Sequence, residues 1–175
     1  MSKLHDVSKL AGVLRGITIA AMITLPITII GGLLATPLIP EAMNGDFTVS
    51  PDATQAQLIA ATVLNLLSPL ILIWILNEMR KLFSNYAAGN ILTDQCAHLI
   101  QRIGQGFLAL AIVPLVLRPI QSVLLTLANP PGQRSLAIGL NRDMIFFALA
   151  GGLVVIIGWA MREASDAASE NRSFV

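Results

Sequence analysis

The polar stretch Asn77–Arg102, which reads NEMRKLFSNYAAGNILTDQCAHLIQR, divides an otherwise apolar chain into two halves. Its apolar residues recur at helical spacing on both sides of Gly89-Asn90. A glycine at this place favours a helix end, because it adopts the left-handed conformation that closes a helix. Thr93 is a suitable N-cap for a second helix, and Asp94 in the first turn suits the helix dipole. The stretch therefore predicts two helical arms that fold back on each other.

Apolar side chains on the two arms are expected to meet and to bury a seam outside the bilayer. They are Leu82, Phe83 and Tyr86 on the first arm and Cys96, Leu99, Ile100 and Ile103 on the second. Because each set repeats at three to four residues, each lies on one face of its helix.

The composition of the chain indicates a membrane protein. Of its 175 residues, 55% are hydrophobic and 12% are charged, whereas soluble domains carry about 25% charged residues. The single cysteine, Cys96, excludes an internal disulfide. A cleaved signal peptide is not expected, because the first apolar run is longer than a typical signal core and lacks a small-x-small cleavage site.

Four apolar runs have the length needed to cross a hydrocarbon core of about 30 Å. They cover residues 16–39, 56–76, 103–128 and 144–161. The predicted fold is an all-α integral membrane protein with a single domain, residues 1–175. Its four transmembrane helices form two hairpins, which the helical connection 77–102 joins, and a tail, 162–175, follows the last helix.

The distribution of Lys and Arg predicts the orientation of these helices. The N-terminal segment, the 77–102 connection and the tail hold Lys3, Lys9, Arg15, Arg80, Lys81, Arg102, Arg162 and Arg172, whereas the other two loops hold only Arg134 and Arg142. Loops rich in Lys and Arg stay in the cytoplasm. Both termini and the 77–102 connection are therefore expected to be cytoplasmic.

Arg118 is the ionisable residue that lies well inside an expected span. A charge within a membrane is costly and marks a functional site by default. However, Arg118 lies about 22 Å along the helix from Ile103, which places it near the outer headgroups. There it has a structural alternative, as an interfacial anchor or a partner of Glu41 or Asp46 in the acidic first loop.

Polar residues also interrupt the second span, at Asn65, Ser68 and Pro69. Because proline has no N–H, Pro69 leaves the carbonyl of Asn65 without its helical donor, and a kink is expected. Asn65 and Ser68 either line a polar pocket within the membrane or hold neighbouring helices together.

The candidate partner-binding residues lie on the connection and on the tail. They are Arg80, Lys81, Tyr86 and Arg102 on the connection and Glu163, Asp166 and Glu170 on the tail. The three tail acids share one helical face, which is either a solvated surface or a contact with the basic residues of the connection.

The sequence favours no enzymatic chemistry. Cys96 and His98 point apart on a helix, and His5 is the one other histidine in the sequence, so three or four converging metal ligands are not expected. No catalytic triad or phosphate-binding loop is present in the sequence, and we expect no catalytic residue, metal or cofactor. No Asp or Glu lies within an expected span, which argues against an ion-coupled transporter.

Small residues recur every four positions at Gly12, Gly16 and Ala20, and again at Ala148 and Gly152. Rows of this kind allow two helices to pack closely, either within one chain or between copies of it.

Two motifs resemble a known bacterial membrane family. The first is Leu82-Phe83-x-x-Tyr86-x-x-Gly89-x-x-Leu92-Thr93, followed by Leu99 and Ile103-Gly104, and the second runs from Met161 through Glu163-Ala164 and Glu170-Asn171 to Val175. Together they resemble the family called domain of unknown function 2975 over most of the chain. The chain departs from the family pattern at Leu92, where an aromatic residue is common, and at Ser169, where an acidic residue is common.

The resemblance implies four spans, no known catalytic residue and a place in the bacterial inner membrane. Some similar proteins are membrane partners encoded beside small helix-turn-helix regulators. It therefore implies a protein that holds a cytoplasmic regulator at the membrane without contacting nucleic acid itself.

Three hypotheses remain open on sequence alone. The first is a non-enzymatic interaction protein that sits in the lipid bilayer and binds a cytoplasmic partner through the connection and the tail. The second is a small channel or transporter that works as a homo-oligomer. The third is a structural subunit of an envelope complex.

Overall fold

The computed structural model describes residues 2–35, 53–127, 129–130, 134 and 136–173. These residues form five helices: α1 (Ser2–Ala35), α2 (Gln55–Asn65), α3 (Leu67–Ala87), α4 (Asp94–Thr126) and α5 (Arg142–Ser173). No strand occurs in the described part of the chain. The expectation of an all-α chain is confirmed for these residues.

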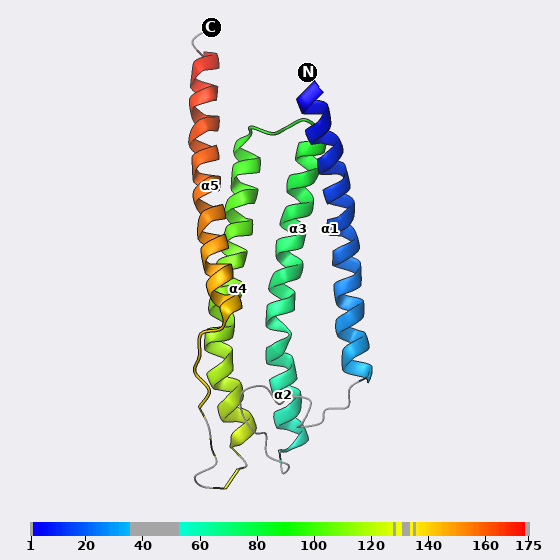
Figure 1. Cartoon of the computed structure of the whole chain (residues 1–175), viewed down its shortest axis with the longest axis vertical. Helices are drawn as coiled ribbons and strands as arrows, with labels where there is room; N and C mark the ends of the chain where they lie inside the picture. Colours follow the sequence, from blue (N-terminus) through cyan, green and yellow to red (C-terminus); the bar gives the residue numbers. More distant parts are fainter. Residues whose placement is uncertain (1, 36–52, 128, 131–133, 135, 174–175) are drawn as a thin grey trace.

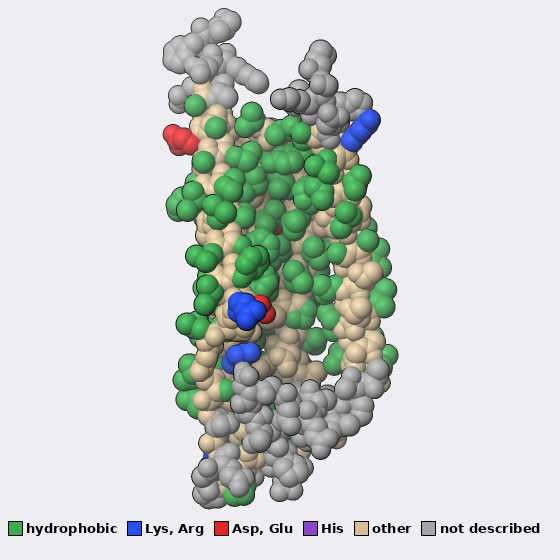
Figure 2. Space-filling view, viewed as in Figure 1, with side chains coloured by type: hydrophobic (Ala, Val, Ile, Leu, Met, Phe, Trp, Pro, Cys, Tyr) green, Lys and Arg blue, Asp and Glu red, His purple; other side chains and the backbone are tan. Residues whose placement is uncertain are grey.

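Four helical stretches are long and apolar enough to cross a membrane. They are Val7–Leu34, Gln55–Ala87, Asp94–Thr126 and Arg142–Ala167, with mean hydropathies between 2.0 and 2.3. Figure 2 shows a face covered largely by hydrophobic side chains, with a few charged side chains near its upper end and a further group lower on its left side. The count of four long apolar helices is confirmed, whereas membrane insertion stays a prediction. Residues 36–39, at the end of the first expected span, lie outside the described residues.

The helices pack as a row that follows chain order (Figure 1). α1 packs mainly on α3, α3 on α4, and α4 on α5, while the short α2 contacts both α3 and α4. The helices lie side by side, and both ends of the chain lie at the same end of the helix axes as the connection between α3 and α4. We call this end, defined by residues 2–9, 88–93 and 162–173, the terminal end.

The ends of α3 and α4 follow the local chemistry of their sequence. α3 ends at Ala87, and Gly89 adopts a positive φ of 84°. The Thr93 hydroxyl accepts a hydrogen bond from the Cys96 N–H, so Thr93 caps α4. The predicted stop at Gly89 and the predicted cap at Thr93 are confirmed.

The main core lies between α3 and α4 and includes the predicted seam. Its buried residues are Ile75, Leu82, Cys96, Leu99, Ile100, Ile103 and Leu110, with Tyr86 and Met79 packed against them. Phe83 is partly buried but lies outside this cluster. The cluster extends from the connection into the apolar part of α4, so the connection and the expected spans share one core.

Pro69 interrupts the second long helix, as predicted. α2 ends at Asn65, and the Leu66 N–H bonds to the carbonyls of Thr62 and Val63, both at 3.2 Å. α3 then begins at Leu67. Since Pro69 cannot donate to the Asn65 carbonyl, the hydrogen-bond ladder has a gap here, and the helix divides into two parts.

Glycines bring α4 and α5 into close contact. A Cβ atom added at Gly151 would lie 2.8 Å from the Gly104 carbonyl oxygen and 2.8 Å from the Leu108 nitrogen. Backbone atoms cannot move away as a flexible side chain can, so only glycine fits. The small-residue positions that the sequence singled out, Gly12, Gly16 and Gly152, have no atom within 4 Å of an added Cβ and take no part in this packing.

We predict that Gly151→Ala lowers the stability of the protein in detergent by about 1–3 kcal/mol, the usual cost of overpacking a tight contact. The control is Gly152→Ala, the next residue of the same helix, which has open space around an added Cβ. Because alanine favours a helix over glycine by about 1 kcal/mol, this variant should be equally stable or more stable. Thermal unfolding followed by circular dichroism measures both, and equal losses would contradict the packing argument.

Candidate functional site

The most unusual side chain in the structure is the carboxylate of Glu78, which is buried between α3 and α4. Glu78 is 1% exposed, although it carries a charge. It lies one turn before Leu82 on the face of α3 that packs on α4. Glu78 falls two residues beyond the expected second span, but inside Gln55–Ala87, the helical stretch with the composition of a span. Buried acidic side chains are rare unless they are paired.

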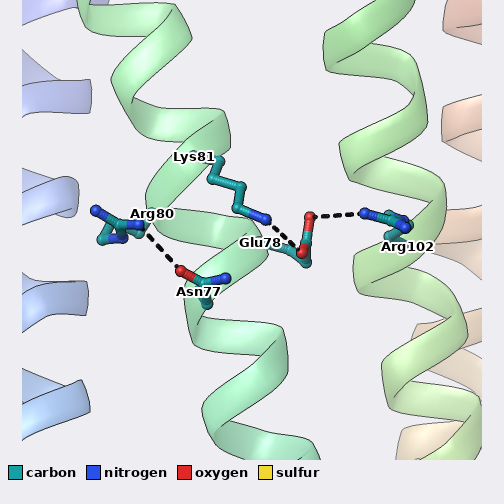
Figure 3. Close-up of polar contacts among 5 residues, drawn as sticks. All are labelled: Asn77, Glu78, Arg80, Lys81 and Arg102. Carbon is teal, nitrogen blue, oxygen red and sulfur yellow. Dashed lines mark hydrogen bonds and ion pairs between the residues drawn. The ribbon is translucent and has the colours of Figure 1, made fainter.

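Two basic side chains compensate the charge of Glu78 (Figure 3). The Lys81 ammonium donates a hydrogen bond of 2.8 Å to Glu78 Oε1. Arg102 on α4 places Nη1 at 3.7 Å from Glu78 Oε2, an ion pair too long for a hydrogen bond. The side chains of Lys81 and Arg102 are 43% and 57% exposed, so their charged ends remain accessible. The carboxylate therefore joins α3 to α4 and holds two cations at one place.

These three residues line an open groove between α3 and α4. The other residues that line it are Gln95, His98 and Leu99, and its volume is about 430 Å³. Lys81 and Arg102 carry two positive charges against the single buried carboxylate of Glu78. The groove is thus basic at its surface.

A second charged contact ties the start of α4 to α5. Arg162 Nε lies 3.3 Å from Asp94 Oδ1, and His98 Nε2 lies 3.6 Å from Asp94 Oδ2. The tail acids were expected to form either a solvated surface or a contact with basic residues of the connection. The pair seen here has the opposite polarity, since the tail supplies the arginine and the connection supplies the acid. Glu163 and Asp166 are exposed, and Glu170 lies in α5 where side chains are not described.

The basic residues predicted to bind a partner do not form one surface. Arg80 points from α3 toward α1, away from Lys81 and Arg102 (Figure 3), and its Nη2 donates to Asn77 Oδ1 at 3.1 Å. Tyr86 packs against the core instead of standing in solvent. Of the four predicted residues on the connection, only Lys81 and Arg102 share a groove.

Asn65 joins two helices. Gln121 Nε2 on α4 donates a 2.9 Å hydrogen bond to Asn65 Oδ1, next to a small apolar cluster of Leu58, Ala61 and Leu125. Ser68 is partly buried. A crevice of about 180 Å³ does lie at Pro69, but its lining is entirely apolar and includes neither Asn65 nor Ser68. The geometry matches a contact between helices rather than a polar pocket.

Arg118 lies beside the extended segment that precedes α5. Arg118 and residues 136–139 line a cavity of about 310 Å³, and the Ala137 N–H donates to the Ser122 hydroxyl at 3.0 Å, which fixes this segment along α4. Glu41 and Asp46, the acidic partners expected for Arg118, lie outside the described residues.

Cysteine and histidine do not converge in the described part of the chain. The buried Cys96 thiol donates to the Asn90 carbonyl at 3.1 Å, and His98 faces Asp94. No group of three or more potential metal ligands occurs among the described residues.

Sequence reasoning missed Glu78 and Asp94 as members of charged contacts between helices. Glu78 carries a usable signal, because it falls within the apolar spacing Ile75, Leu82 and Tyr86 and therefore at the edge of the seam. An acidic residue on a packing face requires partners, and the nearby basic residues are Lys81 and Arg102.

Comparisons of the chain with protein-family models, curated proteins and solved structures give no match. The resemblance to domain of unknown function 2975 therefore stays a prediction, and the site has to be interpreted from its own geometry.

We predict that Lys81→Met together with Arg102→Met costs about 3–5 kcal/mol of stability, the usual cost of leaving a buried charge without its partner. Glu78→Gln added to this double variant should recover much of the loss, because no charge is then buried. Unfolding of the unmodified protein, the double variant and the triple variant in the same detergent measures both steps. A third substitution that makes the double variant less stable would show that the carboxylate does not depend on these cations.

Proposed function

We propose that this protein is a non-enzymatic, multi-pass protein of the bacterial inner membrane that binds a cytoplasmic protein partner at its terminal end. The observation that carries this proposal is the length of α5. Arg162 is paired with Asp94, the first residue of α4, yet α5 continues to Ser173. Residues 163–173 therefore extend about 16 Å beyond the start of α4, as Figure 1 shows.

The charges on α4 and α5 support insertion in a membrane. On α5, residues 144–161 carry no charge and measure about 27 Å at 1.5 Å per residue, close to the hydrocarbon thickness of about 30 Å. Arg142 and Asp143 precede this segment, and Arg162 and Glu163 follow it. On α4, Arg102 and Arg118 lie about 24 Å apart along the helix. The two helices thus present a comparable apolar band between charged residues.

The excess of Lys and Arg at the terminal end supports its placement in the cytoplasm. The surface there has features of a binding site for a protein. The tail helix carries the exposed acids Glu163 and Asp166, and Leu92 on the connection is 66% exposed. The partner implied by the family resemblance is a small helix-turn-helix regulator, which would bind DNA itself while this protein holds it at the membrane.

A channel or transporter built from one copy finds less support. The described helices form a row and not a ring, so a pore would require several copies. Gly12 and Gly16 on α1 have open space around them, which is compatible with a homo-oligomer. If the protein were a subunit of a larger envelope complex, the open face of α1 would be available for contact with another subunit.

We predict that removal of residues 163–175 abolishes partner binding and leaves the membrane domain folded, because the deletion retains the Asp94–Arg162 pair. Affinity purification of the tagged chain from native membranes in mild detergent, with quantitative mass spectrometry, measures the partner. The control is Arg142→Gln, at the opposite end of α5, which should retain the partner. A partner that remains bound to the truncated chain would contradict the proposed use of the tail.

We predict that a membrane-impermeant maleimide reaches the two ends of the helices from opposite sides of the membrane. In a Cys96→Ser background, Leu140→Cys should react in intact spheroplasts, because Leu140 is exposed and precedes α5, separated from the tail by the uncharged segment 144–161. Leu92→Cys should react only after the membrane is permeabilised. The reverse pattern would place both termini outside the cytoplasm and would exclude a cytoplasmic partner.

A further inference from the structure

We infer that the groove between α3 and α4 binds the phosphate headgroup of an anionic phospholipid, with Lys81 and Arg102 as its cationic ligands. This inference rests on the insertion of the helices in a membrane and is independent of any protein partner. The groove has a volume of about 430 Å³ and lies at the depth where the apolar band of α4 begins.

Charge complementarity is the first argument. Two cations face the groove, and the carboxylate that balances one of them lies beneath them with its side chain 2% exposed. An incoming anion therefore meets Lys81 and Arg102 before it approaches Glu78. Basic pockets between membrane helices recognise anionic lipid headgroups in this way.

The geometry of Arg102 is the second argument. Its contact with Glu78 is 3.7 Å long, and it makes no hydrogen bond to another described residue. A guanidinium has five N–H donors in a planar fork that matches two phosphate oxygens. Glu78 holds this group in position, while its donors remain available to a ligand. Gln95 and His98, which line the same groove, add further polar groups.

A partly exposed tryptophan one turn from the groove is the third argument, and it favours a lipid over a soluble phosphate. Trp74 lies one turn before Glu78, on the same side of the α3–α4 contact as Lys81, because residues 74, 78 and 81 share one helical face. Its ring lies against Gly106, one turn after Arg102, where an added Cβ would be 3.0 Å from it. Trp74 is 39% exposed. A headgroup at Lys81 and Arg102 would thus place an acyl chain beside Trp74.

Trp74 also provides the test, because the chain has two tryptophans and replacing the other one leaves Trp74 as a single fluorescent reporter. The protein carrying Trp159→Phe leaves Trp74 as the reporter and is reconstituted in phosphatidylcholine vesicles. Phosphatidylglycerol or phosphatidylcholine with brominated acyl chains is added at equal mole fraction, because bromine quenches tryptophan at contact. We expect stronger quenching of Trp74 by the brominated phosphatidylglycerol. Lys81→Gln and Arg102→Gln should each lower the preference by about five-fold, the contribution of one basic residue near an anionic surface.

Matched controls separate the site from general attraction to an anionic membrane. Arg80→Gln removes a charge at the same depth that points toward α1, and it should leave the preference unchanged. The reciprocal protein, Trp74→Phe, reports from the exposed Trp159 on α5 and should show equal quenching by the two lipids. A charge-conserving variant, Lys81→Arg with Arg102→Lys, should retain the preference and controls for folding.

The inference is overturned if the two brominated lipids quench Trp74 equally, or if the preference survives Lys81→Gln with Arg102→Gln. It is also overturned if millimolar inorganic phosphate abolishes the preference, because the groove would then serve a soluble anion. None of these results depends on the tail, so the partner hypothesis is tested separately.

Discussion

The contact between α3 and α4 is the constraint on which the rest of the structure depends. α1 packs on α3 and α5 packs on α4, so the two halves of the chain are held together chiefly through this single interface. The apolar cluster that fills it extends from Leu82 and Cys96 to Leu110. Within a membrane, lipid tails offer an equally apolar environment, so apolar burial alone gives helices little reason to associate. Specific contacts are therefore needed, and the interface supplies the Glu78 ion pairs and the close approach of Ile75 to Gly106.

The three helix contacts of the row differ in kind. α4 and α5 approach through Gly104, Gly151 and Gly158, where no larger side chain fits without displacement of backbone atoms. α3 and α4 are held by packing and by charge. α1 shows neither device along most of its length, and its small residues Gly12 and Gly16 face open space. Because α1 has the fewest specific contacts of the helices in the row, it is the helix best suited to contact lipid or a second copy of the chain.

Local chemistry explains how much of this fold could be predicted from the sequence. The stop at Gly89, the cap at Thr93 and the break before Pro69 depend on backbone conformations and hydrogen bonds within a few residues. The residue types at these positions are therefore enough to predict them. Glu78 could not be placed in the same way, because its burial depends on Arg102, which lies on another helix. The partners Asn65 and Gln121 are 56 residues apart. The pair between Arg162 and Asp94 was not predicted, because charge counting cannot tell which of several ions comes level with Asp94.

The two candidate binding surfaces at the terminal end differ in depth and in sign of charge. The groove at Lys81 and Arg102 is basic and lies where the apolar band begins, whereas the tail beyond Arg162 presents Glu163 and Asp166 farther from that band. An anionic headgroup would neutralise the excess charge of the groove and would not involve the acids of the tail. Since exposed ion pairs contribute only about 0–1 kcal/mol each, those acids alone cannot hold a partner. A stable complex at this end therefore requires apolar contacts as well. Leu92, which is exposed on the connection at the terminal end, is a residue that can supply one.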